Sequence, residues 1–478
     1  MKRITFILAM LISLGAFSQK IQWGQEYKAD DKTSIYDYIG NIEDNSYFAF
    51  GYKTTGFLRR FNRIGFMKVN SNNVKSYTDE YIEIPLFSLI NSFTTANNIA
   101  VLYSQENKDN ETNEVRCKLI DKNTLTENSE KVLLSFNIAR KDNASVNIFH
   151  SKDKSKIAIS YYNYNRKTEE SYLVFTVFDN TLDKLWANQY TTQQEGLVSI
   201  LDVETTDEGD IYVLSKAKDE KTKLILTKIN GEEVVEKVVS NDLDFNNVKL
   251  HIINNNTVFI ADNTKGKFTG ITYNIGNGEI TNTVSFEYIK EAGTYWGIKD
   301  IYQLENGNLV TVVEDSYVHI EESTTAPATY TYYNRNFYSI CVNPNDSKIV
   351  YNQLLSKATR YFNRYKIGGG QFESPLYFTV GNDFYAIYNA DKDDNDLAGQ
   401  LFIETNITFP KGGKSVVTNK LKIDEQGKPT QITLFGKKET DAMFSANISF
   451  ELEKGKLILG RFVDGKNINF GTMQFNAE

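Results

Sequence analysis

The chain has 478 residues, of which 13% are aromatic and only 6 are proline. This length suffices for one large repeat domain or two ordinary domains, and the aromatic-rich, proline-poor composition favours an all-β protein. The formal net charge of −8 at pH 7 excludes the chain as a whole from the basic class of nucleic-acid binders.

Residues 1–18 have the pattern of a secretory signal peptide. Two basic residues come first, Phe6–Leu14 forms an apolar centre, and Ala16 and Ser18 supply the small side chains that a signal peptidase reads. The apolar run is shorter than the roughly 20 residues that a spanning helix needs. We therefore expect an exported protein, periplasmic or associated with the outer membrane. Its mature chain, residues 19–478, should form one domain without a membrane span.

The N-terminal end of the mature chain repeats a pattern found further along. Trp23 and Tyr27 have the same spacing as Trp186 and Tyr190, which we place in the outermost strand of a repeat. The last recognisable strand, Ile468–Phe475, is the third of its repeat. We expect the N-terminal run to supply the missing fourth strand, which would close a ring and leave no free sheet edge.

A two-part strand pattern then occurs eight times along the chain. Its first part is a strongly β-forming run after a tight polar turn, as in NIAVLYS (98–104) and DIYVLSK (210–216). Its second part is a strand that ends on a polar turn, as in FTVFDNTLD (175–183). A four-stranded propeller blade takes about 40–50 residues. We therefore expect a single β-propeller of four-stranded blades, with eight blades favoured and seven as the alternative.

Four long insertions interrupt this repeat, at residues 56–65, 316–336, 357–374 and 389–414. Three follow the second strand of a blade and one links two blades, so a propeller would bring all four out on one face. Loops held by a rigid scaffold are common binding sites, and Arg and aromatic residues are enriched at protein–protein hot spots. The candidate partner-binding residues are Phe57, Arg59, Arg60, Phe61, Arg63, Tyr330, Tyr332, Tyr333, Arg335, Arg360, Tyr361, Phe362, Arg364 and Tyr365. The alternative is that these side chains cover the ends of their own blades.

The sequence shows no catalytic or cofactor motif, and we predict neither an enzymatic activity nor a cofactor. No acidic pair stands out as the two carboxylates of a glycosidase. The histidines are too far apart in sequence for a metal site; they are His150, His251 and His319. The best metal candidate is the set Asp391, Asp393 and Asn395, which matches the start of a calcium loop. Asp396 stands where that loop needs Gly, so we favour a solvated acidic turn.

The two cysteines, Cys117 and Cys341, both lie in apolar strand runs. They could pair in an exported protein, but we expect them in distant repeats, where the Cα separation would exceed the disulfide limit of about 7 Å. Their pairing stays open at this point.

The stretch FDNTLDKLWANQY (178–190) is typical of a loose class of exported propellers in Gram-negative envelopes. Within that class, the chain resembles the periplasmic plug subunit of the type IX secretion translocon, on its size, its expected export and its aromatic and Arg insertions. This resemblance implies a non-enzymatic propeller that docks a protein partner, in an outer-membrane or periplasmic complex such as a secretion channel. The alternative is a glycan-binding or glycan-cleaving propeller.

Overall fold

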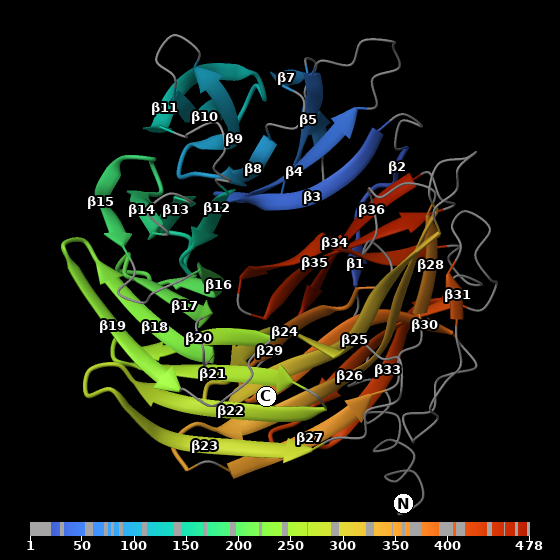
Figure 1. The fold of residues 1–478 in the computed structure, drawn as a ribbon. Coiled ribbons are helices and arrows are strands. Elements are labelled where there is room, and N and C mark those ends of the chain that lie inside the picture. The colour runs from blue at the N-terminus through green and yellow to red at the C-terminus, as the bar shows by residue number, and fades with distance from the viewer. Residues whose placement is uncertain are drawn as a thin grey trace, which may run out of the picture.

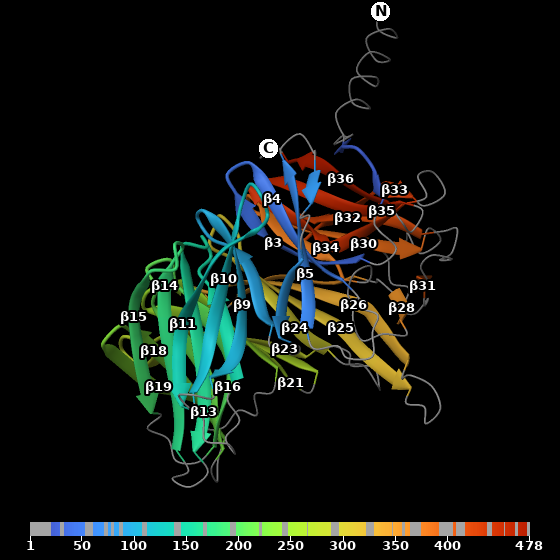
Figure 2. The same cartoon turned by 90° about the horizontal axis from the view of Figure 1, so that it is seen from above.

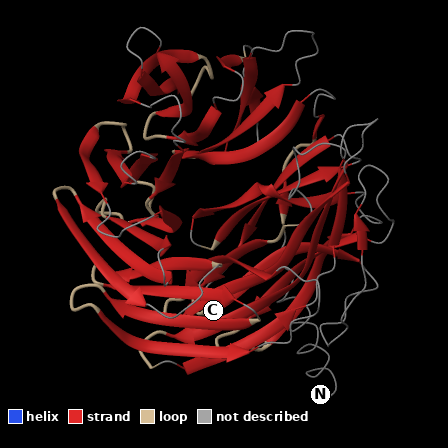
Figure 3. Cartoon of the chain, in the orientation of Figure 1, coloured by secondary structure: helices blue, strands red, loops and turns tan. Residues whose placement is uncertain are grey.

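The computed structural model of the chain describes most residues between Ile21 and Phe475. The described residues are 21–28, 33–52, 61–70, 75–77, 81–85, 89–107, 112–137, 145–165, 170–191, 197–218, 222–240, 247–264, 266–287, 296–321, 329–346, 348–355, 359–363, 374–391, 405–407, 416–436, 442–453, 455–463 and 467–475. Within these ranges the chain forms strands and turns and no helix (Figure 3). The expected signal peptide lies outside them.

The described strands form eight sheets set around a ring (Figure 1), and the four strands of each blade pair antiparallel. In each sheet the first strand lies nearest the ring centre and the fourth lies at the rim. This is an eight-bladed β-propeller, so both the predicted all-β class and the favoured blade count are confirmed.

The first four blades follow one another along the chain. Blade one has β3 (Thr33–Ile42), β4 (Asn45–Tyr52), β5 (Phe61–Asn70) and an outer strand in two parts, β6 (Lys75–Tyr77) and β7 (Ile82–Pro85). Blade two has β8 (Leu89–Thr94), β9 (Asn98–Asn107), β10 (Thr112–Asp121) and β11 (Glu127–Asn137). Blade three has β12 (Ser145–His150), β13 (Lys156–Asn165), β14 (Glu170–Asp179) and β15 (Lys184–Thr191). Blade four has β16 (Leu197–Thr205), β17 (Ile211–Lys218), β18 (Thr222–Asn230) and β19 (Glu233–Ser240).

The last four blades contain the longer departures from the repeat. Blade five has β20 (Val248–Asn254), β21 (Thr257–Thr264), β22 (Lys267–Asn274) and β23 (Glu279–Glu287). Blade six has β24 (Trp296–Gln303), β25 (Leu309–Glu321), β26 (Thr329–Asn343) and β27 (Lys348–Leu355). Blade seven has β29 (Leu376–Val380), β30 (Asp383–Asp391), β32 (Val416–Ile423) and β33 (Pro429–Gly436). Blade eight has β34 (Ala442–Glu453), β35 (Lys456–Val463) and β36 (Asn467–Gln474), and takes its rim strand from β1 (Gln22–Trp23) and β2 (Tyr27–Lys28).

The ring is closed by the N-terminal strand, as predicted. Trp23 of β1 lies opposite Gly471 of β36, and the Gly24 N–H donates to the Phe470 carbonyl at 2.8 Å. The guanidinium carbon of Arg461 lies 3.7 Å from the centre of the Trp23 ring, a cation–π contact. A Cβ on Gly471 would stand 2.6 Å from that ring, so only glycine leaves room for the tryptophan.

The hydrophobic core lies between blades rather than within them. Each of the eight largest apolar clusters among the described residues combines side chains of two neighbouring blades. The second strands are therefore covered on both faces, and all residues from Ile99 to Tyr103 in β9 are buried. This explains why the second-strand runs read as continuously apolar rather than alternating. Cys117 in blade two and Cys341 in blade six are buried and unpaired, as their expected separation indicated.

Candidate functional site

Three of the four insertions meet in one extension of the blade-six sheet. The strand β28 (Thr359–Asn363), from the link between blades six and seven, pairs antiparallel with the outer part of β26. The strand β31 (Thr405–Ile407), from the insertion of blade seven, pairs parallel with β28. Figure 2 shows the far end of the β25–β26 hairpin standing out from the ring. Segments that are distant in sequence therefore form one continuous surface.

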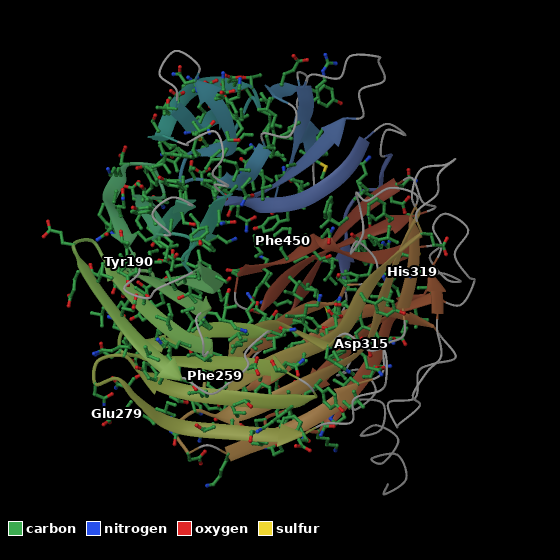
Figure 4. All side chains as sticks on the ribbon, in the orientation of Figure 1. Tyr190, Phe259, Glu279, Asp315, His319 and Phe450 are labelled. Carbon is green, nitrogen blue, oxygen red and sulfur yellow. The ribbon has the colours of Figure 1, made fainter. Side chains whose placement is uncertain are left out.

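The prediction that these insertions are loops is wrong for the parts that form this extension. Tyr332 lies opposite Tyr361 and Tyr333 opposite Arg360 in a regular ladder, with Tyr330 and Phe362 on the same two strands. The physical reason is local: TYTYYN and TRYFN consist mainly of β-branched and aromatic residues, which favour strands once an edge is available for pairing. His319 lies on the outer part of β25, farther along the hairpin than Asp315 (Figure 4).

The other predicted partner-binding residues are not part of the regular ladder between β26 and β28. Arg335 falls where the β25–β26 ladder is irregular. Phe61 and Arg63 begin β5 in blade one, and Arg63 forms an ion pair with Glu83 of β7 at 2.7 Å. The other partner-binding candidates lie outside the described residues; they are Phe57, Arg59, Arg60, Arg364 and Tyr365. Of the calcium-loop candidates, Asp391 ends β30, whereas Asp393 and Asn395 lie outside the described residues.

A second candidate site was not predicted: a cavity of about 750 Å³ at the ring centre. Inner strands of blades three to eight line it, together with the turns that follow β12 and β16. His150 and His251 both line the cavity, although the sequence separates them widely. The cavity also contains several acidic and aromatic side chains; they include Phe149, Glu204, Asp300, Tyr302 and Tyr377.

The carboxylates in and beside this cavity also join blade four to blade five. Glu204 Oε2 accepts the Ile252 N–H at 2.8 Å, and Asp202 accepts the Leu250 N–H at 2.9 Å. The inner strand of a blade is a sheet edge, so some of its N–H groups have no partner within the blade. The carboxylates of β16 accept hydrogen bonds from such N–H groups of β20 in the next blade. Asp202 also pairs with Lys249 at 3.2 Å, whereas Glu204 Oε1 stands 3.9 Å from His251 Nδ1.

Burial and charge together shift the titration of these groups. Burial raises the pKa of Glu204 to about 7, and the carboxylates of Asp202 and Asp300 add to that rise. Burial also raises the pKa of Asp300. The same cause lowers the pKa of both His150 and His251 to about 4. At neutral pH the two imidazoles are therefore uncharged, while Glu204 is divided between its acid and its carboxylate.

One feature of the sequence points to this site in hindsight. β16 carries the acidic pair Asp202 and Glu204 at alternate positions in a largely apolar strand, and β24 carries Asp300 and Tyr302 at alternate positions. Acidic residues are depleted in strands, so such a pair indicates either an inter-strand bond or a site. Their convergence from different blades is visible only in the folded ring.

The described ranges contain no candidate for a metal-holding group or for a membrane-spanning helix. There, no group of three or more His, Cys, Asp or Glu side chains is arranged to hold a metal ion. The part of the chain that the structure describes also has no helix with the length and hydropathy of a membrane span.

Comparison with known proteins bears on the fold alone. No protein-family model matches it, and no curated protein does. The solved structure of the Dos1 propeller matches at 10% identity over 95% of each chain, with a TM-score of 0.43. The WD40 domain of SCAP from fission yeast matches at 10% identity over 95% of this chain and 96% of that one, with a TM-score of 0.37. Because these scores are low, the fold assignment depends on the strand pairing itself.

Proposed function

We propose that this protein is a non-enzymatic, exported propeller that docks a protein partner through the blade-six extension. By this we mean the outer parts of β25 and β26 with β28 and β31. The observation that carries the proposal is the assembly of this extension from three separate insertions. The ring closes without it, so its strands are surplus to the fold and available for a partner.

The chemistry of the insertions supports this function. More than half of the arginines of this acidic chain lie in three of the four insertions, close in sequence to tyrosine and phenylalanine. Arg and aromatic residues bury large area and still find polar partners, which is why they dominate protein–protein hot spots. The complementary partner would present an acidic and aromatic surface.

The signal-peptide pattern of residues 1–18 and the resemblance to envelope propellers support a partner in the periplasm or at the outer membrane. A protein-secretion channel, such as the type IX translocon, is the kind of complex that we infer. Fractionation of cells that express the full chain should recover a protein shortened by about 18 residues in the envelope fraction. Recovery of the full-length chain in the cytoplasm would contradict this part of the proposal.

Charge reversal of the insertions tests the docking surface. The triple variant Arg335→Glu, Arg360→Glu and Arg364→Glu should lose a stoichiometric partner that the unchanged protein retains in pull-downs from envelope extracts. These arginines belong to the insertions at residues 316–336 and 357–374. We therefore expect the melting temperature to change by only about 2 °C.

The matched control changes the same charge elsewhere. Lys184, Lys267 and Lys428 are exposed and lie in blades three, five and seven. Their triple change to Glu should leave the partner bound. Equal loss of the partner in both triple variants would mean that net charge alone decides binding, and retention in the arginine variant would reject the surface.

Glycan binding is the second candidate, and the central cavity is the observation that favours it. A saccharide of two or three rings fits a volume of about 750 Å³, and aromatic and carboxylate side chains are the usual partners of sugars. Binding of envelope or plant polysaccharide fragments, lost when Tyr302 or Tyr377 is changed to Ala, would support this alternative.

A further inference from the structure

The central cavity carries an excess of negative charge among its lining residues. Five carboxylates line it, and Lys152 is the single Lys or Arg among those residues. The carboxylates are Glu204, Asp207, Glu208, Asp300 and Glu451. Lys249 lies nearby and pairs with Asp202; its charge also acts on Glu204 and Asp300, so it offsets part of this excess.

The carboxylates that line the cavity differ in the hydrogen bonds they accept. Asp207 accepts the Asp153 N–H at 3.0 Å, which orders the turn after β12. Asp300 Oδ1 accepts the N–H of its own neighbour, Ile301, at 2.9 Å. The Tyr302 side chain also bonds to this carboxylate, and the Asp300 side chain is open to the cavity. The five carboxylates outnumber Lys152 in the lining, and a cleft lined mainly by one sign of charge favours the entry of the opposite sign, here a cation.

A buried polar atom points to a ligand independently of the charge. Thr205 lines the cavity and is only 7% exposed, yet its Oγ1 has no hydrogen-bond partner among the described residues. A buried hydroxyl without a partner costs about 1–3 kcal/mol, so such groups are normally satisfied. A ligand that enters the cavity could accept from, or donate to, this hydroxyl.

Aromatic rings complete the lining. Phe149, Tyr302, Tyr377 and Phe378 belong to inner strands of blades three, six and seven. Aromatic faces attract cations and also pack against an apolar body. The cavity therefore combines negative charge with aromatic surface.

We propose that the central cavity binds a small organic cation, an ammonium group carried on an aromatic or apolar body. The ammonium group lies between Glu204 and Asp300, and the body packs against Tyr302 and Tyr377. The carboxylates are spread over several blades, and in the described ranges they do not form a metal-holding group, which fits an extended organic cation better than a metal ion. This inference is independent of partner docking through the blade-six extension.

The titration of Glu204 is consistent with this proposal. Burial raises its pKa to about 7, and a bound cation would lower it again by favouring the carboxylate. Binding at pH 7 should therefore release a proton from this carboxyl. The charged or titratable groups around it are Asp202, Lys249, His251 and Asp300; His251, with a pKa lowered to about 4, stays neutral in this range.

The test compares tyramine with 4-ethylphenol, which has the same ring and ethyl chain but no ammonium group. Titration calorimetry at pH 8 on the mature chain should show saturable binding of tyramine at least about tenfold tighter than that of 4-ethylphenol, as expected for about 1.4 kcal/mol from the charge. The changes Glu204→Gln and Asp300→Asn should each remove most of this preference while leaving the affinity for 4-ethylphenol unchanged.

A control variant and two further ligands make the test decisive. Glu233→Gln removes one exposed negative charge from the rim strand β19 and should leave tyramine binding intact. Equal binding of tyramine and 4-ethylphenol, or no binding of tyramine, overturns the proposal. Binding of cellobiose alone would assign the cavity to glycans, and binding of Ca²⁺ alone would assign it to a metal. Each variant is first checked for an unchanged melting temperature at pH 5.

Discussion

The ring is held together by two different kinds of joint, and the contrast between them is instructive. Between blades four and five, side chains of one inner strand bind the backbone of the next, through Asp202 to Leu250 and Glu204 to Ile252. At blade eight, an N-terminal strand pairs by its backbone with the last strand of the chain, and Asn469 donates to the Gly24 carbonyl at 2.7 Å across 445 positions.

The difference lies in what the covalent chain already provides. Blades four and five are consecutive, so their joint needs only a few side-chain bonds to orient two sheets that the chain holds near each other. Blade eight has no chain connection to its rim strand, and loop closure over the whole length must be offset by pairing and packing. We therefore expect loss of the closing strand to affect the cooperativity of the fold more than loss of another rim strand would.

Removal of the closing strand should have the largest effect. A chain without residues 19–28 leaves β36 as an open edge, and open edges pair with other molecules. We expect self-association in size-exclusion chromatography and a melting temperature lower by about 10 °C or more. A synthetic peptide of residues 19–28 should restore the monomer. A truncated chain that stays monomeric and equally stable would show that the pairing is dispensable.

Two equivalent tryptophans give a finer comparison. Trp23 and Trp186 occupy the rim strands of blades eight and three, and both are partly buried. Trp23→Ala should cost about 2–3 kcal/mol, because it removes the contact with Arg461 and the edge-on contact with Phe435 at 5.4 Å.

Trp186→Ala is the matched control for this variant. This change should lower the free energy of unfolding by less than Trp23→Ala does. Hydrogen exchange should increase only within β15, because that strand is covalently connected to its own blade. Trp23→Ala should instead increase exchange in β36. Equal losses of stability with unchanged exchange in β36 would remove the distinction between the closing strand and an ordinary rim strand.

The smallest effect is expected at the joint between blades four and five. The pKa of Glu204 is raised from the ordinary value to about 7. Its contribution to stability is therefore complete below about pH 4.5 and is lost as the pH rises through 7. Glu204→Gln keeps an acceptor for the Ile252 N–H and removes this ionisation. The variant should match the unchanged protein at pH 5 and melt about 1–2 °C higher at pH 8, after allowance for partial exposure.

Melting curves of both proteins at the two pH values check this expectation. The exposed Glu233→Gln serves again as the control, with no difference expected at either pH. A constant difference between Glu204→Gln and the unchanged protein at pH 5 and pH 8 would mean that the ionisation of Glu204 does not matter to the joint.

Much of the ring could be predicted from local patterns. The second strands are recognisable because inter-blade packing demands apolar residues on both faces, as from Ile99 to Tyr103. The turns are recognisable by their Asp, Asn and Gly residues; at Asp179, the side chain accepts the N–H groups of Thr181 and Asp183. The repeated spacing of Trp23 and Tyr27 then indicated how the ring closes.

The sites were less predictable because they depend on positions that no local pattern specifies. Tyr332 and Tyr361 were expected on separate loops, and their pairing required an open edge on β26 that only the folded blade provides. Similarly, Glu204 and Asp300 are ordinary acidic residues in the sequence, and the ring alone brings them to one cavity.

The sequence by itself therefore determined the strand class, the blade count and the closing strand, because each is encoded in a period, a turn or a repeated pair of aromatic residues. The tertiary structure alone decided that three insertions form one sheet and that carboxylates, histidines and tyrosines from six blades share the central cavity. The physical reason is that strand pairing and electrostatics act through space, between residues whose separation along the chain carries no information about their distance.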